Sequence, residues 1–342
     1  MIKQRCTIKD VAGRAGVAVS TASLVLNNKG YVSSDLRRKV QLAVEELGYV
    51  PNRTARSLIS KATGNIGFVV SEEHFSTAEP FYTRVFLGTE FEARQWDSYV
   101  LLTTVPNKFH QSHIPRFILE RNVDGVVFAG KISEAYASAV VAESLPSVVV
   151  DYEFKRVRIP AINIDNRRGT SLAVEHLFSL GHKRIAFIGG DVSHPSIKLR
   201  LDGYMQAVKK LGLEPSNELI SVDAAGTGTY DGYTAARTLL DQAAGFSSVV
   251  ACNDAVAIGA IRAFRENGMN IPEDCSVVGF DDIELCEHVE PRLTSISVPK
   301  EDLGATALRV LRRLIKEDEQ PISSVLIEPT LVARQSTVGV HD

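Results

Sequence analysis

The spacing of apolar residues changes near Lys61, and each side of that point predicts a different structure. Before it, apolar side chains recur at helical spacing, with one helix that must end at Gly16 and a second that runs from about Val19 to Leu26. Glycine adopts the positive φ of a helix end at little cost, so a tight turn joins the two helices. The pattern predicts a helix-turn-helix, whose second helix lies in the major groove of DNA.

After Lys61, short β-branched runs alternate with amphipathic segments. We expect strands at 66–70, 99–102, 125–128, 147–150, 185–188, 218–222, 248–251 and 276–280, and helices at 84–95, 112–121 and 134–143. Strand, helix and strand at this spacing indicate parallel βαβ units. Because the same alternation restarts at residue 185, the pattern predicts two similar α/β subdomains in succession.

The two regions also differ in charge. Residues 1–61 contain eleven Lys and Arg against four Asp and Glu, a net charge of +7, whereas the whole chain carries −3, which leaves −10 on the rest. A basic segment on an acidic body suits a polyanion, because neutralising phosphates releases counterions and supplies much of the affinity for DNA. A solvated helix face is the alternative explanation of the charge alone.

Length and composition exclude other classes of protein. A chain of 342 residues with 44% hydrophobic residues is long enough for two or three domains. The four cysteines (Cys6, Cys252, Cys275 and Cys286) form no CxxC pair, and the N-terminus has no apolar signal stretch, so a reduced cytoplasm is expected. No apolar run reaches the roughly 18 residues of a membrane span.

The sequence shows no arrangement that predicts catalysis. It has no nucleophile paired with a base, no metal-ligand spacing and no phosphate-binding loop. The stretch 188–191 does not match GxGxxG, and His110 and His113 form an unsupported pair in a polar stretch. We therefore expect no enzyme activity, no metal and no cofactor.

Several motifs, in order along the chain, resemble the LacI/GalR family of bacterial transcription regulators. In the first sixty residues these are TIKDVAxxAGV from Thr7, Ser20-Thr21-x-Ser23-x-Val25-Leu26-Asn27, Glu45-Glu46-Leu47-Gly48-Tyr49-x-Pro51-Asn52 and Ala55-Arg56-Ser57-Leu58. Later they are Gly181-His182-x-x-Ile185-Ala186-x-Ile188, Arg200-x-x-Gly203-Tyr204, Asn253-Asp254-x-x-Ala257-x-Gly259, Val278-Gly279-Phe280-Asp281-Asp282 and Leu331-Val332-x-Arg334-x-Ser336-Thr337. The resemblance covers essentially the whole chain.

The resemblance implies an all-α helix-turn-helix headpiece (1–50), a hinge helix and linker (51–62) and an α/β core like that of periplasmic binding proteins (63–342). The core would have two doubly wound parallel-sheet subdomains, one formed by 63–161 and 293–325, the other by 162–292 and 326–339. The crossovers between them would lie near 161–164, 292–297 and 326–328. The core would form the dimer and would bind the effector between its subdomains.

In the headpiece, alignment to the family places Val19, Ser20 and Leu24 where side chains face base edges. Two of the three are apolar, so readout is expected to combine a Ser20 hydrogen bond with contacts to thymine methyl groups. Packing of Leu24 against the first helix is the structural alternative. Ala18 stands where relatives usually carry a helix-capping Ser, a difference that costs about 1 kcal/mol.

Two further groups of residues are expected on the DNA backbone and in the minor groove. Phosphate contacts are assigned to Thr7, Thr21, Ser23, Asn27 and Lys29, for each of which a capping or turn role is about equally open. In the hinge, the candidates are Asn52, Ala55, Arg56 and Leu58. This segment would become helical only on DNA and against the dimer mate, with Leu58 wedged into the minor groove. A plain interdomain linker is the alternative.

For the effector, the resemblance points to Arg200, Asn253, Asp254 and Asp281 on loops of the second subdomain. Asp and Asn pair with vicinal hydroxyls, and Arg presents a planar fork of donors, so a sugar is expected. Further candidates are His194 and Ser196, in a loop that often selects the ligand, and Phe81 or Tyr82, which would stack on a sugar ring. Asp254 has an N-cap role as its structural alternative.

The resemblance also implies the partners and the mode of action. It predicts a homodimeric repressor on a pseudo-palindromic double-stranded DNA operator. Closure of the effector cleft would change the spacing of the two hinge segments and so alter operator affinity. A regulator controlled by a protein co-regulator, or one without small-molecule response, is the alternative.

Overall fold

The structure is a computed structural model that describes residues 6–27, 30–50, 62–72, 81–222, 226–242, 245–316 and 324–340. The chain divides into two compact units, Met1–Thr63 and Gly64–Asp342. The first is all helical in its described part, and the second contains two six-stranded sheets. This division agrees with the change of pattern in the sequence near Lys61.

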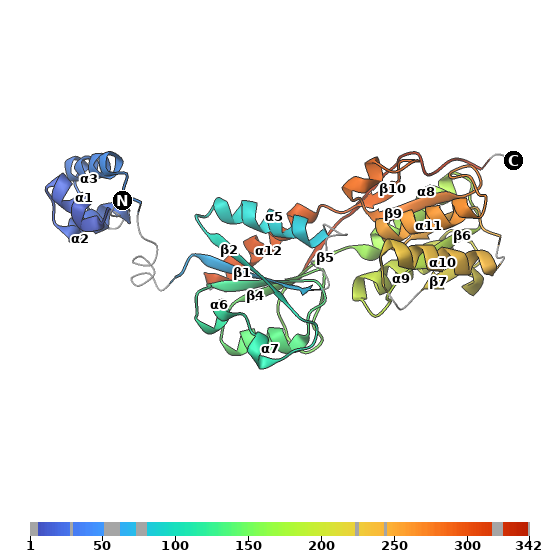
Figure 1. The fold of residues 1–342 in the computed structure, drawn as a ribbon, viewed down its shortest axis with the longest axis horizontal. Coiled ribbons are helices and arrows are strands. Elements are labelled where there is room, and N and C mark those ends of the chain that lie inside the picture. Colours follow the sequence, from blue (N-terminus) through green and yellow to red (C-terminus); the bar gives the residue numbers. More distant parts are fainter. Residues whose placement is uncertain are drawn as a thin grey trace. The chain divides into compact units, whose positions relative to one another are not determined.

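The first unit packs three helices, α1 (Ile8–Ala15), α2 (Val19–Leu26) and α3 (Ser34–Leu47), around a small apolar core (Figure 1). The buried side chains are Val11, Ala12, Ala22, Val25, Val40 and Ala43. Each helix contributes two of these residues, so the three helices form one core. The second helix has the bounds expected from the sequence.

Local capping fixes the ends of these helices. Gly16 ends α1 with φ 66° and Gly48 ends α3 with φ 57°, both in the left-handed region that glycine adopts without strain. Ser33 begins α3, and its side chain accepts a hydrogen bond from the amide of Leu36. Ala18 begins α2 without any side-chain cap. The expected stop at Gly16 is confirmed, and α2 lacks the cap that a Ser would supply.

In the second unit, the first sheet is entirely parallel in the order β11-β5-β4-β3-β1-β2. Its strands are β1 (Asn65–Ser71), β2 (Tyr99–Val105), β3 (Gly125–Ala129), β4 (Ser147–Val150), β5 (Ala161–Ile164) and β11 (Val325–Ile327). Helices α5 (Phe81–Arg94) and α12 (Lys300–Ile315) cover one face, and α6 (Arg116–Leu119) and α7 (Glu134–Ala142) the other (Figure 1). Burial on both faces explains the continuous apolar runs of the central strands.

The second sheet has the order β12-β10-β9-β8-β6-β7, and β12 is antiparallel to β10. Its strands are β6 (Ile185–Gly189), β7 (Ile220–Val222), β8 (Ser248–Ala251), β9 (Ser276–Asp281), β10 (Thr294–Ser297) and β12 (Thr330–Val332). Its helices are α8 (Asn166–Ser179), α9 (Pro195–Lys210), α10 (Thr229–Asp241) and α11 (Asp254–Glu266). Single-turn 3-10 helices occur at Gln111–His113, Asn217–Leu219 and Glu284–Glu287.

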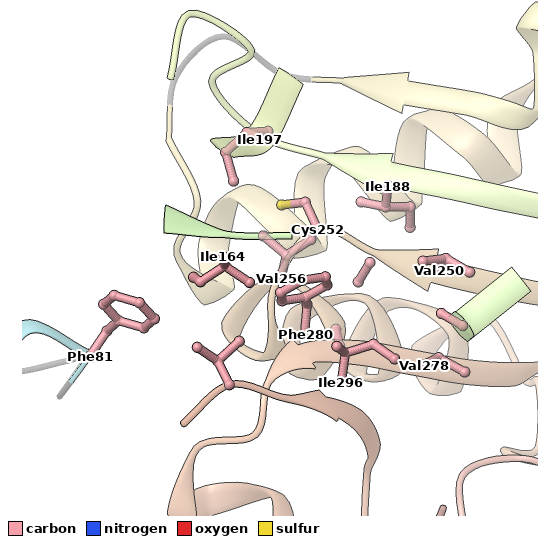
Figure 2. Close-up of a cluster of buried hydrophobic side chains, with 14 of the residues drawn as sticks. Phe81, Ile164, Ile188, Ile197, Val250, Cys252, Val256, Val278, Phe280 and Ile296 are labelled. Atoms are coloured by element: carbon pink, nitrogen blue, oxygen red, sulfur yellow. The ribbon is translucent and has the colours of Figure 1, made fainter. Parts of the chain in front are cut away.

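The core of the second sheet is built from apolar side chains of its strands and of the helices that cover them. Figure 2 shows Phe280 of β9 packed among Val256 of α11, Ile296 of β10 and Ile164 of β5. The strand residues are fully buried or nearly so. Ile164 belongs to a strand of the first sheet, so the apolar core continues from one sheet to the other.

Three expectations about element boundaries are wrong. The crossover segments form strands: 162–164 belong to the first sheet, whereas 294–297 belong to the second, because they pair with β4 and β9 respectively. The single helix expected at 112–121 is broken into a 3-10 turn and one α-turn by Pro115, which removes a backbone donor. The expected strand at 218–222 begins as a 3-10 turn and is extended only over its last three residues.

Candidate functional site

A cavity of about 300 Å³ lies between the two subdomains of the second unit, at the carboxyl ends of strands from both sheets. It is lined by Phe81, Tyr82, Lys131, Asp151, Asp191, His194, Ser196, Ile197, Arg200, Gly226, Thr227, Asn253 and Asp281. This volume is at the low end of ligand pockets, which span about 300–1,000 Å³. Six of the seven expected effector residues lie in this lining, and Asp254 does not.

Arg200 is the most buried charged group of the cavity, with 4% of its surface exposed. Its Nη2 donates to Asp281 Oδ1 at 3.0 Å, its Nε to Asn166 at 2.8 Å and its Nη1 to the carbonyl of Cys252 at 2.6 Å. The guanidinium also stacks on the ring of Phe280 at 3.7 Å. Burial opposes the charged form, yet the Asp281 carboxylate raises the pKa of Arg200 above its ordinary value.

Asp151 joins the two subdomains through hydrogen bonds. It follows β4, and its Oδ2 accepts from Tyr82 Oη at 2.8 Å while its Oδ1 accepts from Ser196 Oγ of α9 at 2.7 Å. Burial, together with the neighbouring Asp151 carboxylate, raises the pKa of Tyr82 well above its ordinary value, so the phenol keeps the proton that it donates. Ser196 is thereby oriented by a residue of the other subdomain.

A second connection between the subdomains lies at Lys131, after β3. Its ammonium donates to Ser193 Oγ at 2.9 Å and lies 3.6 Å from Asp191 Oδ2, both in the loop after β6. Burial opposes ionisation of Asp191, but hydrogen bonds from the amide and hydroxyl of Ser193 hold the pKa of Asp191 below its ordinary value. Lys131 therefore faces an ionised carboxylate across the cleft.

His194 begins α9 as its N-cap residue, and its ring contacts Tyr152 at 6.3 Å between centroids. Burial lowers the pKa of His194 below its ordinary value, so the ring is neutral at pH 7. A neutral ring has one donor nitrogen and one acceptor nitrogen. Its Nδ1 accepts from the amide of Ser196 at 3.3 Å.

Asn253, not Asp254, caps α11. Its Oδ1 accepts from the amide of Val256 at 2.8 Å, and its Nδ2 donates to the carbonyl of Thr227 at 3.0 Å. The N-cap role expected as the alternative for Asp254 thus belongs to its neighbour. Asn253 still lines the cavity, and its amide is held in one orientation by both bonds.

Asp254 lies below the cavity and is 1% exposed. Its carboxyl group accepts from Ser295 Oγ at 2.5 Å and from the amide of Ile283 at 2.8 Å. A Cβ on Gly279 would lie 2.1 Å from its Oδ1, so the carboxyl fills the space that this glycine leaves. Burial first, and the Asp281 carboxylate second, raise the pKa of Asp254 to about 7. Its position makes it a structural group beneath Asp281 and removes it from the proposed ligand contacts.

A buried lysine holds the backbone next to Asp281. Lys300 opens α12 and is 6% exposed, and its ammonium donates to the carbonyl oxygens of Asp281, Asp282 and Val298. Asp281 has φ 99° and Asp282 φ 53°, which are unusual for residues other than glycine. The three carbonyl contacts stabilise this backbone, which aims the Asp281 carboxylate at Arg200.

Sequence reasoning missed Lys131, Asp151 and Asp191. Each lies within two residues of the end of a buried strand, β3, β4 or β6, at the edge of the sheet where ligands bind in such folds. A systematic reading of the two residues that follow each strand would have found them. Phe81 and Tyr82, the two alternatives for the stacking residue, both line the cavity.

On the first unit, the three residues expected at base edges share the outward side of α2. Val19 is 42% and Leu24 41% exposed, and Ser20 is also exposed. The neighbouring Ala22 and Val25 are buried against α1 and α3. The packing of this helix therefore uses other residues and leaves Val19, Ser20 and Leu24 accessible.

Some of the residues expected to contact phosphates form hydrogen bonds within the headpiece. The amide and hydroxyl of Thr7 both donate to Asp10 at the start of α1, and Asn27 Nδ2 donates to the carbonyl of Ser23 at 2.8 Å. These bonds show the capping role for Thr7 and Asn27, which leaves the remaining lone pairs for other partners. Lys29 and the hinge candidates Asn52, Ala55, Arg56 and Leu58 lie outside the described residues.

Comparison with known families and structures now adds to this geometry. Residues 7–52 match the model of the bacterial regulatory proteins of the lacI family, and residues 174–337 match a periplasmic binding protein-like domain. The ribose operon repressor of Haemophilus influenzae is 33% identical over 96% of this chain and 98% of its own. The chain belongs to the LacI family. It is a DNA-binding transcription regulator with a helix-turn-helix headpiece and a periplasmic-binding-protein-like core, and the expected fold class is confirmed.

Other relatives and structures of LacI-family proteins match over nearly the full length. The regulator CelR of Thermobifida fusca is 34% identical over 98% of this chain and 99% of its own. A Lac repressor dimer bound to operator and an anti-inducer superposes with a TM-score of 0.81 at 29% identity, covering 98% of this chain and all of that one. A CelR-cellobiose complex superposes with a TM-score of 0.73 at 30% identity, covering 97% of this chain and all of the other.

The matched relatives are transcription regulators and not enzymes. Among the helices of the described residues, none is both long and apolar enough to span a membrane.

Proposed function

We propose that this LacI-family protein is a homodimeric repressor whose affinity for its operator is set by a sugar bound in the cavity between the core subdomains. The observation that carries the proposal is the convergence of Arg200, Asp281 and Asn253 on one side of the cavity with Asp151 and Phe81 on the other. It acts where chromosomal DNA is found, in the cytoplasm.

The headpiece would read the operator through α2. Its exposed Val19 and Leu24 provide apolar surface for thymine methyl groups, and Ser20 provides a hydroxyl for a base edge. Thr7, Thr21, Ser23, Asn27 and Lys29 would fix the register on phosphates, which carry no sequence information. Asn52, Ala55, Arg56 and Leu58 would bind the minor groove as a hinge.

The cavity suits a ligand with several hydroxyl groups. Asp281, Asn253 and His194 offer acceptors and donors, and two of the five N–H groups of Arg200 lack a partner in the hydrogen bonds described above. Phe81 presents an aromatic ring to a sugar face. Relatives named as the ribose operon repressor and as a CelR-cellobiose complex support a carbohydrate effector.

The dimer contact that we propose for the core includes the outer edge of the first sheet. Strand β2 is at this edge, and its Tyr99 is 60% exposed. Phe91 on α5 is 50% exposed, and Trp96, which follows α5, is 46% exposed. Exposed edge strands with apolar side chains are usually covered in native proteins. A Lac repressor that this chain resembles was solved as a dimer on its operator, which supports the same state here.

Effector control would operate through the two subdomains. Asp151 with Ser196, and Lys131 with Ser193, connect the subdomains across the cavity, so a bound sugar would change how tightly the cleft closes. Closure in both protomers would alter the spacing of the two hinge segments and therefore operator affinity. This coupling requires that the sugar bind the two states of the cleft with different affinity.

The test combines operator selection with ligand titration. Binding-site selection with full-length protein should yield a pseudo-palindrome, and fluorescence anisotropy on that sequence should then show a change in affinity when one sugar of a panel is added. A protein that selects an operator but responds to no sugar would instead be controlled by a protein partner or by no ligand. Selection of no sequence at all would refute the DNA-reading assignment.

A further inference from the structure

We infer that the effector of this protein is an uncharged polyhydroxylated molecule, and that the cavity discriminates against the phosphorylated and carboxylated forms of the same molecule. The inference rests on the proposed function, since it concerns the ligand of the same cavity. It follows from the pairing of charges around the cavity, which the sequence motifs alone do not reveal.

The charge balance of the lining is negative. Among the described residues of the cavity, three carboxylates, Asp151, Asp191 and Asp281, face two cations, Lys131 and Arg200, and the His194 ring is neutral. A phosphate or carboxylate entering this space would meet an excess of like charge.

Both cations are already neutralised by carboxylates. Arg200 forms its ion pair with Asp281 at 3.0 Å, with the two side chains 5% and 14% exposed, so neither partner can turn to solvent. If an anionic ligand took the Arg200 guanidinium, it would leave Asp281 as a buried charge without its partner. Removing one partner of a buried pair is strongly unfavourable.

Lys131 gives the same result at the other side of the cavity. Its ammonium is held by Ser193 and lies 3.6 Å from Asp191, whose ionised form is stabilised by two hydrogen bonds from Ser193. An anionic group that approached Lys131 would therefore also approach Asp191. Like charges brought together at a binding site oppose association strongly.

Ligand hydroxyl groups, in contrast, can donate hydrogen bonds to the carboxylates of the cavity. Asp151 accepts bonds from two neutral hydroxyls, Tyr82 and Ser196, which shows that this buried carboxylate is satisfied by uncharged O–H donors. Asp281 and Asp191 can accept further hydrogen bonds from ligand hydroxyls while keeping their cations. A neutral polyol therefore binds without breaking either ion pair.

Calorimetry with matched ligands tests the inference on the full-length protein. The panel pairs D-ribose with ribose 5-phosphate, D-glucose with glucose 6-phosphate, gluconate and glucosamine, D-galactose with galactose 6-phosphate, and cellobiose with cellobionate. We expect one neutral sugar to bind and its phosphorylated or carboxylated partner to bind on the order of 100-fold more weakly. Tightest binding by a phosphate, a sugar acid or glucosamine would overturn the inference while leaving sugar control of the repressor intact. No heat from any member would remove both.

A pair of variants tests the physical cause. Asp191→Asn keeps the shape of the side chain but leaves the Lys131 charge unbalanced, so the preference for the neutral sugar over its phosphate should fall about tenfold. The control is Asp202→Asn, since Asp202 pairs with Arg167 and Lys198 on the surface of α9 and does not line the cavity. An unchanged ratio in Asp191→Asn, or an equal fall in Asp202→Asn, would show that cavity charge does not set the selectivity.

Discussion

The outward face of α2 and the cavity of the core are built on opposite principles. Val19 and Leu24 expose apolar side chains on a helix of eight residues, and the buried side of that helix consists of other residues. In the cavity, the charged groups of Arg200 and Asp151 are buried and bound to several partners, as Arg200 is to Asp281, Asn166 and Cys252. The exposed face depends on which residues the helix carries, whereas the cavity depends on a network assembled from distant parts of the chain.

This difference predicts different consequences of substitution. A change on the α2 face should alter operator recognition and leave the stability of the headpiece nearly unchanged. A change in the cavity should alter ligand affinity and stability together, because a buried charge that loses its partner destabilises the folded state.

The largest effect is expected for Arg200→Met. Loss of the guanidinium leaves the Asp281 carboxylate, 14% exposed, without its cation, and should lower the free energy of unfolding of the core by about 3–5 kcal/mol. Urea unfolding followed by circular dichroism measures the loss. Arg167→Met is the matched control, since Arg167 pairs with Asp202 at the surface and should change stability by less than about 1 kcal/mol. Equal losses of stability in the two variants would contradict the idea that the buried ion pair matters more to stability than the surface ion pair.

The buried Asp254 should give the core a pH dependence of its own. Its pKa is raised to about 7, whereas an Asp in the unfolded chain has a pKa of about 4, so between these values the folded state holds a proton that the unfolded chain has released. Its contribution to stability is thus fully present below about pH 4 and is lost as pH rises to about 7, for a total of several kcal/mol.

Asp254→Asn removes this titration while keeping an oxygen acceptor. The difference in the free energy of unfolding between the variant and the parent protein should therefore shift in favour of the variant as pH rises from about 4 to about 7, and should then be constant. Denaturation curves at several pH values give this difference. A difference that does not change with pH would show that Asp254 is ionised throughout, against the burial that raises its pKa.

Two adjacent residues on α2, Leu24 and Val25, separate recognition of the operator from packing of the headpiece core. Leu24→Ala should weaken binding to the selected operator about tenfold, and change headpiece stability by less than about 0.5 kcal/mol, because Leu24 is 41% exposed. Val25→Ala, at 5% exposure, should instead cost about 2 kcal/mol of stability. Anisotropy and thermal unfolding on both variants make the comparison. A Leu24→Ala protein with unchanged operator preference would falsify the base-contact assignment.

The smallest expected effect is a gain in the stability of the headpiece. Ala18→Ser would supply a hydroxyl at the N-terminus of α2, where no side chain caps the helix, and should stabilise the headpiece by about 1 kcal/mol. Thermal unfolding of the full-length protein, monitored at Tyr49 so that the signal reports on the headpiece, measures the change in stability. The same substitution should leave sugar binding by the core unchanged, and a change there would mean that the two units are not independent in stability.

Much of the fold follows from local sequence signals. The bounds of α1 and α2 are set by Gly16 and by the apolar spacing, and the central strands are recognisable because burial on both faces demands β-branched residues. The strands β5, β10, β11 and β12 were not expected. Strands β5 and β10 lack the continuous apolar run that marks β4 and β8 at the same length, and β11 and β12 are three-residue strands at the edges of their sheets.

The residues of the cavity were likewise predicted only in part from the sequence. Arg200, Asn253 and Asp281 belong to motifs that can be read in the sequence, and the structure places all three in the lining. Asp254 belongs to the same motif and yet lies beneath the cavity, since adjacent residues at a helix start point in different directions. A motif indicates which loops reach a site and does not indicate which of its side chains enter it.

The sequence by itself determined that this chain carries a helix-turn-helix, two α/β subdomains and a family-specific set of loop residues, because each depends on spacing within a short stretch. Only the tertiary structure decided the charge balance of the cavity. Asp151 meets Ser196 across 45 positions and Lys131 meets Ser193 across 62, contacts that form because loops at the strand ends of the two sheets face one another. Electrostatic pairing acts through space, so the selectivity of the cavity depends on distances that the order of residues does not contain.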